Sequence, residues 1–344
     1  MQTKNVAVVG ASGYIGEEMV RLLMQHPGAN LTAITSRTYK GQRIGDVFPR
    51  YREADLTFTE PDAAAIAAVA DVAFLALPHG LAATYAIPLL EQGLTVIDVS
   101  ADFRLRSTAK YATYYGAEHP SPELLAQAVY GAPERKRAAI RGAKLIACPG
   151  CYPTSVTIPT CALLRAGVIR PDGIIVSAMS GVSGAGRKES VPLLFSECNE
   201  SLRAYNAVGH RHTPEIEQEL AEAAGVDEVV MNFIPHLVPV TRGIHSTIVA
   251  NLADAHTSAN DLLAVLRETY ADEPFVRVLN AGELADSKHV TWTNRCEIGV
   301  AVDKRTGRAI ISSAIDNLTK GGSGQAVQCF NIVAGFPETT GLNA

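Results

Sequence analysis

The chain of 344 residues, 47% hydrophobic and 19% charged, has the composition of a folded globular protein and is long enough for two domains with sizeable cores. Its 30 Lys plus Arg residues are outweighed by 35 Asp plus Glu, and the resulting net charge of −5 gives no basic excess that would point to nucleic acid as a partner. No apolar run is long enough to span a bilayer, and the amino terminus lacks the features of a signal peptide, so we expect no membrane association.

The first predicted element is a strand over Val6–Val9, which runs through a glycine-rich turn into a helix. Gly10, Gly13 and Gly16 form a G-x-x-G-x-x-G pattern, behind which apolar residues recur at helical spacing. Strand, turn and helix in this order are typical of a dinucleotide-binding fold, because glycines permit close backbone approach and the helix N-terminus faces the pyrophosphate. The cofactor-binding residues predicted from this turn are Gly10, Ser12, Gly13, Tyr14, Ile15 and Gly16.

The next strand, over residues 30–37, indicates which dinucleotide is bound. It ends in Ser36 and Arg37, about twenty residues past the last glycine, where an NAD-specific fold carries an acidic residue. A hydroxyl and a guanidinium suit the 2′-phosphate of NADP instead, so we expect NADP(H) as the cofactor and both residues as its ligands. The alternative is that Arg37 is a solvated loop charge.

Further strand-and-helix units continue to residue 147. One strand ends at Pro78, a predicted cofactor contact, and another over 94–105 carries Arg104 near its C-terminal end. Because such strand ends line the ligand crevice of an open α/β sheet, Arg104 is a candidate for binding an anionic substrate. Position alone also fits a surface arginine. The last strand of this domain, Lys144–Ala147, completes a Rossmann-type fold.

Two cysteines three positions apart, Cys148 and Cys151, follow this strand. Their spacing fits half of a zinc site, a redox dithiol or a single nucleophile with an incidental neighbour. The other cysteines supply no second C-x-x-C, so we expect no metal, and a thioredoxin-like dithiol would stand early in a short domain. Six cysteines are also too few for a disulfide scaffold, which favours a cytoplasmic location.

Of the two, Cys151 is better placed to be a nucleophile. A helix is predicted to start beside it, since Pro153 suits a first helical turn, whereas Pro159 is expected to kink or interrupt the helix. The N–H groups at a helix N-terminus stabilise a thiolate, while Cys148 at the strand exit fits a small buried residue.

Two histidines are candidates for the acid/base partner that a thiolate needs. His210 and His212 precede a helix that we expect to be capped by Thr213, with Pro214 at its start. Because they are two positions apart, they point the same way in an extended chain. Spacing does not decide between them, and we assign proton transfer to His210 and substrate contact to His212.

Two more glycine-rich runs contain candidate ligands. The run over 180–188 follows a strand, and such backbone approaches a cofactor or phosphate closely unless it is a flexible surface loop. Its predicted residues are Ser180, Gly181 and Gly184 for the cofactor, and Arg187 and Lys188 for the substrate. The other run, over 316–326, opens a last helix whose apolar side chains would pack on a sheet.

Together these motifs resemble the N-acetyl-γ-glutamyl-phosphate reductase family of arginine biosynthesis and, more widely, the aspartate-semialdehyde dehydrogenases. The resemblance covers nearly the whole chain, and its motifs in order are GASGYIG, ALPHG, DVSADFRL, YGAPE, PGCYPT, SGVSGAGRK, GHRHTPEI, PHLVPVTRGIHST and DNLTKGGSGQAVQ. The string PGCYPT and the paired histidines point to the acetylglutamyl branch. The chain departs from the family at Cys148, where the family usually has Asn, so only Cys151 matches the family's nucleophile.

The resemblance implies NADPH-dependent reduction of N-acetyl-γ-glutamyl phosphate to N-acetylglutamate 5-semialdehyde, with release of inorganic phosphate. Cys151 would attack the acyl phosphate to form a thioacyl enzyme, a histidine would carry the proton, and backbone N–H groups would hold the oxyanion. Candidates for binding phosphate or carboxylate would be Arg104, Arg187 and Lys188.

The resemblance also implies an α/β architecture in which a Rossmann-type NADP-binding domain over 1–147 precedes a mixed α/β catalytic and oligomerisation domain over 148–317. The second domain would be like the C-terminal domain of glyceraldehyde-3-phosphate dehydrogenase, and the protein would be a dimer or a tetramer. A C-terminal helix within 318–344 would return to the first domain. The residues brought towards the nicotinamide would be Asn317, Gly321 and Gly322.

Two other functions remain open. A related acyl-phosphate or semialdehyde dehydrogenase, of the aspartate or aminoadipate type, would use similar residues on another substrate. A non-catalytic NADP-binding regulator would need no nucleophile. A short-chain dehydrogenase fits the glycine spacing too, but it requires Tyr-x-x-x-Lys, and none of the 11 tyrosines has lysine four positions later.

Overall fold

The computed structural model describes residues 2–343. Contacts between residues divide the chain into two compact units. The first unit contains the residues up to Thr108, Glu118–Pro149 and Gly322–Leu342, and the second contains Ala109–Ala117 and Gly150–Gly321, with Asn343. The stretch 109–117 therefore groups with the second unit, although it lies before the boundary that the sequence suggests at residue 147. Cys148 belongs to the first unit and Cys151 to the second.

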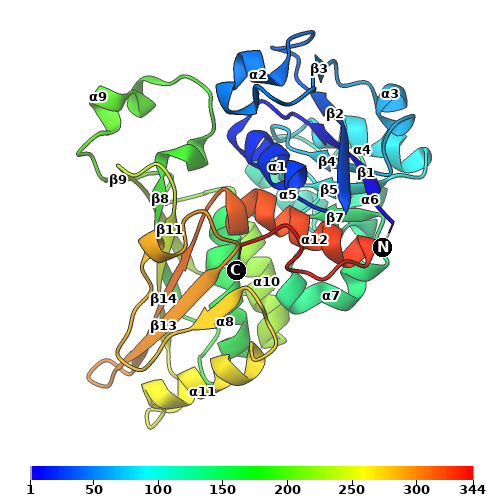
Figure 1. The fold of residues 1–344 in the computed structure, drawn as a ribbon. Helices are drawn as coiled ribbons and strands as arrows, with labels where there is room; N and C mark the ends of the chain where they lie inside the picture. The colour runs from blue at the N-terminus through cyan, green and yellow to red at the C-terminus, as the bar shows by residue number, and fades with distance from the viewer. Residues whose placement is uncertain (1, 344) are drawn as a thin grey trace. The chain divides into compact units, whose positions relative to one another are not determined.

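The first unit is built on a parallel sheet with the strand order β3-β2-β1-β4-β5-β7-β6 (Figure 1). Its strands are β1 (Lys4–Val9), β2 (Ala29–Thr35), β3 (Phe58–Thr59), β4 (Val72–Leu75), β5 (Thr95–Asp98), β6 (Val129–Tyr130) and β7 (Leu145–Ala147). The strand order reverses at β1, between β2 and β4. In open sheets of this kind, ligands bind beyond the carboxyl ends of the strands at such a reversal.

Helices from distant parts of the chain belong to this unit. They are α1 (Tyr14–Met24), α2 (Ile44–Val47), α3 (Ala63–Ala67), α4 (Ala82–Glu91), α6 (Pro122–Gln127), α7 (Pro133–Arg141) and α12 (Gly324–Ala334). Figure 1 shows α12, in red, as the last helix of the chain, and it contacts α1, α7 and β5. Its Val327 and Phe330 are fully buried. A π-helical turn at Thr319–Ser323 leads into it.

The turn between β1 and α1 closes only because its residues are glycines. Gly10 has a φ of +88°, and a Cβ on it would lie 2.4 Å from the carbonyl oxygen of Ala76. A Cβ on Gly16 would lie 2.2 Å from the carbonyl oxygen of Gly10. Both distances are far below van der Waals contact, so any side chain here would push β1, β4 and α1 apart.

The second unit contains a mixed sheet with the strand order β12-β13-β14-β11-β8-β10-β9. Its strands are β8 (Ile175–Gly181), β9 (Arg203–Ala204), β10 (Asn232–Val238), β11 (Ile244–Asn251), β12 (Val276–Val278), β13 (Cys296–Asp303) and β14 (Arg308–Ile315). The inner strands β13, β14, β11 and β8 pair antiparallel, whereas β8–β10 and β12–β13 are parallel. The parallel and mixed sheets confirm the predicted two-part α/β fold class.

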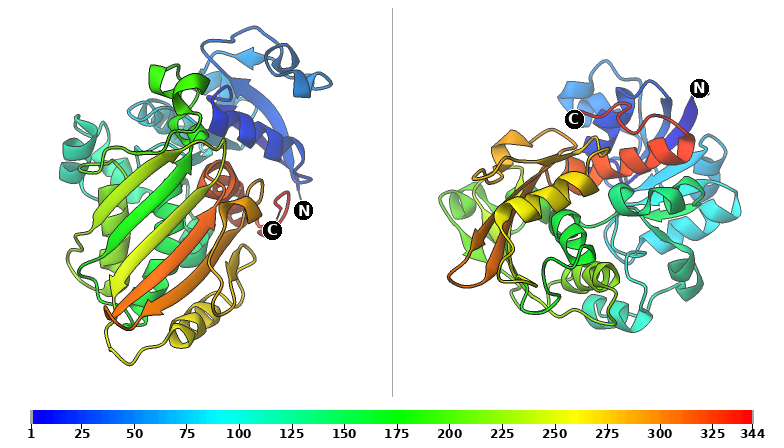
Figure 2. Two further views of the ribbon diagram at one scale, coloured as in Figure 1. Left: turned by 90° about the vertical axis from the view of Figure 1, so that its left-hand side faces the viewer. Right: turned by 90° about the horizontal axis from the view of Figure 1, so that it is seen from below.

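One face of the second sheet is covered by helices and the other is open (Figure 2, left). The helices of this unit are α5 (Thr108–Tyr115), α8 (Cys151–Arg165), α9 (Phe195–Cys198), α10 (Thr213–Ala224) and α11 (Ala259–Thr269). Helix α8 contacts β11 and β14, α11 contacts β13, and α10 packs on α8. Along β11, buried and half-buried residues alternate, as expected when one face of a sheet meets the core. No helix among residues 2–343 is long and apolar enough to cross a membrane.

Two local expectations about the helices are wrong. Helix α8 continues from Cys151 to Arg165 although Pro159 lies inside it. Its burial against β11, β14, α10 and α11 offsets the hydrogen bond that the proline cannot donate. The N-cap of α10 is His212 rather than Thr213, because Thr213 is already helical and Pro214 is accepted anywhere in the first turn.

The glycine turn yields a first prediction. Gly10 and Gly93 have similar φ values, +88° and +86°, so alanine costs about 1–2 kcal/mol of backbone strain at either. A Cβ on Gly93 meets nothing within 4 Å, whereas one on Gly10 overlaps Ala76. We expect Gly10→Ala to lower the free energy of unfolding by about 2 kcal/mol more than Gly93→Ala in urea denaturation. Equal losses would show that the turn tolerates a side chain.

Candidate active site

The glycine turn at the carboxyl end of β1 is tied to the end of β2. Gly10 donates from its N–H to Thr35 Oγ1 at 3.2 Å, and the hydroxyls of Ser12 and Ser36 lie 2.9 Å apart. Gly13 is the N-cap of α1 and provides no side-chain cap. A helix start with glycine backbone and hydroxyls around it is suited to an anionic group such as a pyrophosphate. The residues present therefore fit a dinucleotide.

Arg37 lies at the position where the sequence suggests a 2′-phosphate ligand. Its side chain is exposed and donates from Nη2 to the hydroxyl of Tyr85 at 2.9 Å. Tyr85 stands on α4 and is buried, so it anchors one nitrogen of the guanidinium near the carboxyl ends of the strands. A guanidinium keeps four further N–H groups for other acceptors when one is used in this way.

The other cofactor residues predicted in the first unit lie at element ends. Tyr14 and Ile15 open α1, where the hydroxyl of Ser323 donates to the carbonyl of Ile15 at 2.7 Å. This bond ties the start of α12 to the start of α1. Pro78 is exposed on the link between β4 and α4, and Gly322 is buried.

A buried polar network follows β5. Ser100 donates to Asp98 from both its N–H and its hydroxyl, which ends the strand at Asp98 instead of continuing it to residue 105 as predicted. Asp102 accepts from the N–H groups of Gly80 and Ala82 at 2.6 and 2.8 Å, so the motifs ALPHG and DVSADFRL meet there. Burial raises the pKa of Asp98 to about 7.

Arg104 is buried with 8% exposure, so the alternative of a surface arginine is wrong. Its Nε donates to the carbonyl of Cys148 at 2.8 Å and its Nη2 to the carbonyl of Val99 at 2.9 Å. The side chain thereby joins the ends of β5 and β7. Nε and Nη2 therefore hold the guanidinium of Arg104 against the backbone.

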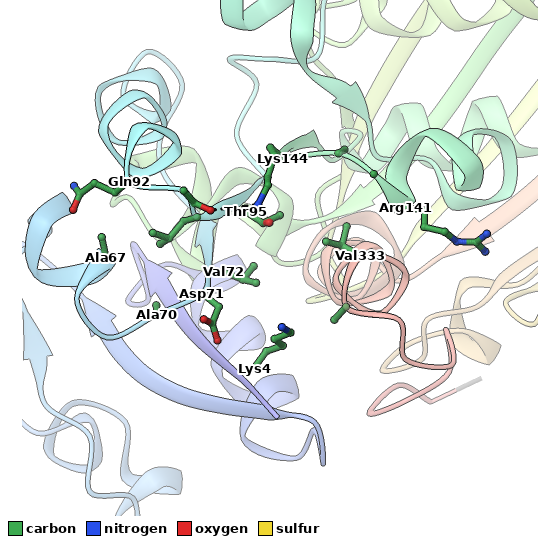
Figure 3. A pocket seen from close by; sticks show the side chains of 15 residues that line it. Lys4, Ala67, Ala70, Asp71, Val72, Gln92, Thr95, Arg141, Lys144 and Val333 are labelled. Atoms are coloured by element: carbon green, nitrogen blue, oxygen red, sulfur yellow. Dashed lines mark hydrogen bonds between the residues drawn. The ribbon is translucent and has the colours of Figure 1, made fainter. Parts of the chain in front are cut away.

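A separate pocket of about 560 Å³ lies at the opposite edge of the first sheet. Figure 3 shows Lys4 at the start of β1, Asp71 and Val72 at the start of β4, and Thr95 at the start of β5. These are the amino ends of the strands, whereas the glycine turn follows a carboxyl end. Since ligands of open α/β sheets bind at the carboxyl ends, this pocket is not the cofactor site.

In the second unit, Cys151 is the first residue of α8 and is half-buried. The N–H of Gly150, the N-cap, donates to Oε1 of the fully buried Glu215 on α10 at 2.9 Å. Gly321 packs directly on the cysteine, since a Cβ on Gly321 would lie 2.8 Å from Cys151 Cβ. The thiol-bearing carbon is therefore held between the start of a helix and a glycine, and the structure brings the predicted Gly321 to the predicted nucleophile.

Aromatic rings and both predicted histidines form a cluster beside Cys151. The centroid of the Tyr152 ring lies 5.9 Å from those of both His210 and His212, and the two imidazoles are 5.0 Å apart. His210 also packs edge-on against Tyr205 and Phe233 at 5.7 and 5.2 Å. The Nδ1 of His210 accepts the N–H of His212 at 3.1 Å, which fixes the ring orientation. The structure thus brings both histidines to the residue that follows the cysteine.

Burial sets the protonation states in this cluster. It raises the pKa of Tyr152, and it raises the pKa of Tyr205 to about 12, so both phenols stay neutral. A negative charge on Cys151 would add to both increases. Burial, with a smaller effect of the Arg211 charge, lowers the pKa of His210 to about 4. His210 is a neutral imidazole at neutral pH and is able to accept a proton.

The glycine run after β8 meets the residue at the end of β14. Asn317 donates from Nδ2 to the Ser183 hydroxyl at 3.0 Å and accepts the N–H of Gly243 at 2.8 Å. A Cβ on Gly184 would lie 2.7 Å from Ser180 Oγ and 3.8 Å from Asn317 Nδ2. The predicted residues Ser180, Gly181, Gly184 and Asn317 are therefore neighbours. Arg187 and Lys188 are exposed and follow Gly186, which has a φ of +80°.

Sequence reasoning missed the residues that surround the thiol and the imidazoles, namely Tyr152, Tyr205, Glu215 and Phe233. Two of them stand inside motifs already recognised. Tyr152 follows the cysteine in PGCYPT, and Glu215 lies one helical turn after His212 in GHRHTPEI. Tyr205 and Phe233 carry no local signal, because only the pairing of β9 and β10 brings them to the cluster.

Chemically, the second unit presents a thiol at a helix N-terminus and, packed on the ring of the next residue, Tyr152, a neutral imidazole. The helix N-terminus favours the thiolate, and its N–H groups are suited to a developing oxyanion. A neutral imidazole is ready to take or return a proton. Such an arrangement is capable of covalent catalysis at an acyl carbon.

Comparison with known proteins agrees with this assignment. Residues 5–143 match the family described as semialdehyde dehydrogenase, NAD binding domain, and residues 151–317 match semialdehyde dehydrogenase, dimerisation domain. The N-acetyl-γ-glutamyl-phosphate reductase of Akkermansia muciniphila is 53% identical over 99% of both chains. The chain belongs to the N-acetyl-γ-glutamyl-phosphate reductase family. The reductase of Pelotomaculum thermopropionicum is 50% identical over 98% of this chain and 97% of its own.

The predicted resemblance to this family is thereby confirmed, and the chain is an oxidoreductase with a dinucleotide-binding domain. Solved structures show the same fold in more distant proteins. Aspartate semialdehyde dehydrogenase II from Vibrio cholerae, complexed with ASA, has a TM-score of 0.75 at 16% identity, covering 97% of this chain and 99% of that one. The enzyme of Candida albicans with NADP has a TM-score of 0.68 at 17% identity over the same shares.

The pKa of His210 leads to a second prediction. The unfolded chain protonates this histidine near pH 6.5 and the folded chain only near pH 4, so the unfolded state binds more protons between these values. The free energy of unfolding should therefore fall as the pH drops through this window. His210→Asn should remove this part of the loss in denaturation curves measured at several pH values. An imidazole of His210 that titrates near pH 6.5 by NMR would contradict the assignment.

Proposed function

We propose that this chain reduces N-acetyl-γ-glutamyl phosphate to N-acetylglutamate 5-semialdehyde with NADPH, a step of arginine biosynthesis, using Cys151 as the nucleophile. The observation that carries this proposal is the placement of Cys151 at the start of α8, next to the Tyr152–His210–His212 cluster and against Gly321. Relatives at 53% and 50% identity that are named for this reaction support the substrate.

The chemistry begins with attack of the Cys151 thiolate on the acyl carbon. The new C–S bond forms as the C–O bond to phosphate breaks, so inorganic phosphate leaves and a thioester remains. N–H groups at the start of α8 stabilise the oxyanion. NADPH, when bound, supplies the hydride that reduces the thioester carbon. The resulting thiohemiacetal releases the aldehyde when its C–S bond breaks, and Cys151 is again a thiolate.

His210 is the proposed proton carrier, and His212 the proposed substrate contact. The neutral imidazole takes the hydroxyl proton of the thiohemiacetal as the aldehyde forms and passes it to the solvent, and in the preceding step the solvent supplies the proton of the reduced oxygen. Tyr152 and Tyr205 stay protonated and exclude water from the imidazoles, which lowers the local polarity.

NADP(H) is the proposed cofactor because Ser36 and Arg37 stand at the end of β2 in place of an acidic residue. The Ser12–Ser36 pair and the anchored Arg37 provide hydroxyls and a guanidinium for the 2′-phosphate. Because Gly10 and Gly16 have no side chains, the backbone at the start of α1 is accessible to the pyrophosphate.

For the substrate phosphate or carboxylate we propose Arg187 and Lys188, whose exposed cations follow the glycine run, and Arg104, whose Nε and Nη2 are anchored on carbonyls. Guanidinium and ammonium groups are the usual partners of such anions. Six free cysteines in the chain favour a reducing compartment, so the proposed location is the cytoplasm.

A homo-oligomer is proposed through the open face of the second sheet. Side chains of β8 and β11 that point away from the helices include Ile175, Met179, Thr247 and Val249, and Met179 is 38% exposed. A broad sheet face with apolar residues favours burial against a second copy of the chain. The family match over 151–317 carries the description of a dimerisation domain.

The third prediction tests the nucleophile and the substrate together. Cys151→Ser should lose turnover by at least about a thousandfold with NADPH binding retained, because a serine hydroxyl is far less nucleophilic at neutral pH. Cys148→Asn should stay active. Turnover is measured in reverse, with N-acetylglutamate semialdehyde, phosphate and NADP⁺. No NADPH formation by the wild type, with turnover of aspartate or aminoadipate semialdehyde instead, would identify a related dehydrogenase. Indifference to Cys151→Ser would point to a regulator.

The fourth prediction concerns the open sheet face. Met179→Glu introduces a charge at its most exposed apolar position and should convert the oligomer to a smaller species, measured by light scattering coupled to size-exclusion chromatography. Val208→Glu is the control, since Val208 is 96% exposed on a loop and its charge remains in water. An unchanged mass for Met179→Glu would place the interface elsewhere.

A further inference from the structure

A fully buried carboxylate at the end of β14 organises the segment that packs on Cys151. Asp316 accepts from Nε and Nη2 of Arg242 at 2.9 and 3.0 Å. It also accepts the backbone N–H groups of Trp292 at 2.6 Å, Leu318 at 2.8 Å and Thr319 at 3.1 Å. One carboxylate thus fixes three separate parts of the second unit, and a bidentate pairing with arginine fixes its orientation.

The backbone held by Asp316 leads directly to the nucleophile. The N–H of Gly321 donates to the carbonyl of Asp316 at 2.8 Å, which closes the turn from 316 to 321. Gly321 then lies against Cys151, with the approach too close for any side chain. The neighbouring Asn317 bonds to the glycine run after β8. A displacement of Asp316 therefore moves the surface that confines the thiol-bearing carbon.

Arg242 is held from two sides. Its guanidinium lies 3.7 Å from the ring centroid of Trp292, and Nη2 also donates to Thr319 Oγ1 at 2.9 Å. Trp292 has a φ of +67°, a left-handed conformation that is rare for a bulky residue. In that conformation its N–H bonds to Asp316 and its ring stacks on Arg242. Such strain persists only where the surrounding contacts determine it.

From these contacts we infer that Arg242 and Asp316 are positioning residues for Cys151. This deepens the proposed function and rests on it, since it concerns the same nucleophile. Neither residue supplies a reacting atom. The pair holds the 316–321 turn so that Gly321 keeps the Cys151 side chain directed to the N–H groups at the start of α8. A buried ion pair by itself is a weak source of stability, whereas this one fixes a geometry.

Loss of the pair should be visible in the reactivity of the thiol. When Gly321 no longer confines Cys151, the side chain samples rotamers turned away from the helix N-terminus, and the thiolate is less stabilised. The pH midpoint for alkylation of Cys151 then rises, and the reaction slows at neutral pH. Because the substrate-binding candidates Arg104, Arg187 and Lys188 lie outside the 316–321 turn, kcat should fall while KM for the acyl phosphate stays nearly constant.

The decisive variant is Arg242→Met, which removes the guanidinium and keeps an apolar chain beneath Trp292. We expect iodoacetamide alkylation of Cys151, followed by mass spectrometry of its peptide, to slow about threefold at neutral pH and its midpoint to rise by about half a unit. We expect kcat to fall about tenfold, with KM within about threefold of the wild type.

Arg277→Met is the matched control. Arg277 pairs with the buried Glu297 at 3.3 Å across β12 and β13, so this variant also removes an arginine–carboxylate pair from the second unit. It should leave alkylation, kcat and KM unchanged. A fall in both variants would mean that the loss of any ion pair weakens the unit, and the inference would be overturned.

The fluorescence of Trp292, the single tryptophan of the chain, provides an independent test of the coupling between Cys151 and the Arg242–Asp316 pair. In the wild type, alkylation of Cys151 should displace Gly321 and shift the fluorescence emission of Trp292 through Asp316. In Arg242→Met the same alkylation should cause no shift, because the link is broken. A merely structural role for the pair would not produce this coupling.

The inference fails if folded Arg242→Met shows the alkylation midpoint and kcat of the wild type. If that variant does not fold, Arg242→Lys decides: lysine keeps the charge but loses the bidentate geometry, so the midpoint should still rise, and an unchanged midpoint would overturn the inference. Alkylation needs no substrate. An enzyme inactive on the acyl phosphate would therefore refute the proposed function while leaving the positioning of Cys151 measurable.

Discussion

The hydrogen bond from Gly150 to Glu215 determines how the second unit presents its chemistry. A glycine N-cap offers no side chain to the start of α8, so a buried carboxylate from α10 takes the N–H there. Glu215 stands in the first turn of α10, directly after the loop that carries His210 and His212. This one hydrogen bond fixes the start of α8, which carries Cys151, to the start of α10. It thereby also fixes the position of the loop that carries His210 and His212.

The first unit depends on a comparable constraint with no polar side chain in it. Gly10 and Gly16 allow the β1–α1 turn to touch β4, which brings the start of α1 to the carboxyl ends of the central strands. The parallel order around β1 is what makes this end a ligand site. Both units therefore place a helix N-terminus with a glycine cap at the point that we propose for reaction or binding. In each unit the N-cap has no side chain that could accept a hydrogen bond from the N–H groups at the helix start, and these groups favour an anion.

Local sequence patterns were sufficient for the elements that depend on neighbouring residues. The strand, glycine turn and helix around Gly10 follow from spacing alone, as does a helix beginning at Cys151. Contacts between distant residues left no such pattern. Glu215 is 65 positions from Gly150 and Asp316 is 74 from Arg242, and neither pairing alters the periodicity of its own segment. The same reason hid the membership of residues 109–117 in the second unit.

The C-x-x-C spacing is misleading because its two cysteines, Cys148 and Cys151, belong to different units. Cys148 has a fully buried side chain in the first unit, and its backbone does the bonding: its N–H donates to Asp98 and its carbonyl accepts from Arg104. Gly131 also packs closely against its Cα. These bonds need a peptide group and a small side chain, and they make no use of a thiol. Cys151, three residues later, is half-buried at a helix start. The C-x-x-C spacing therefore arises because the end of a strand is followed at once by the helix that carries the proposed nucleophile.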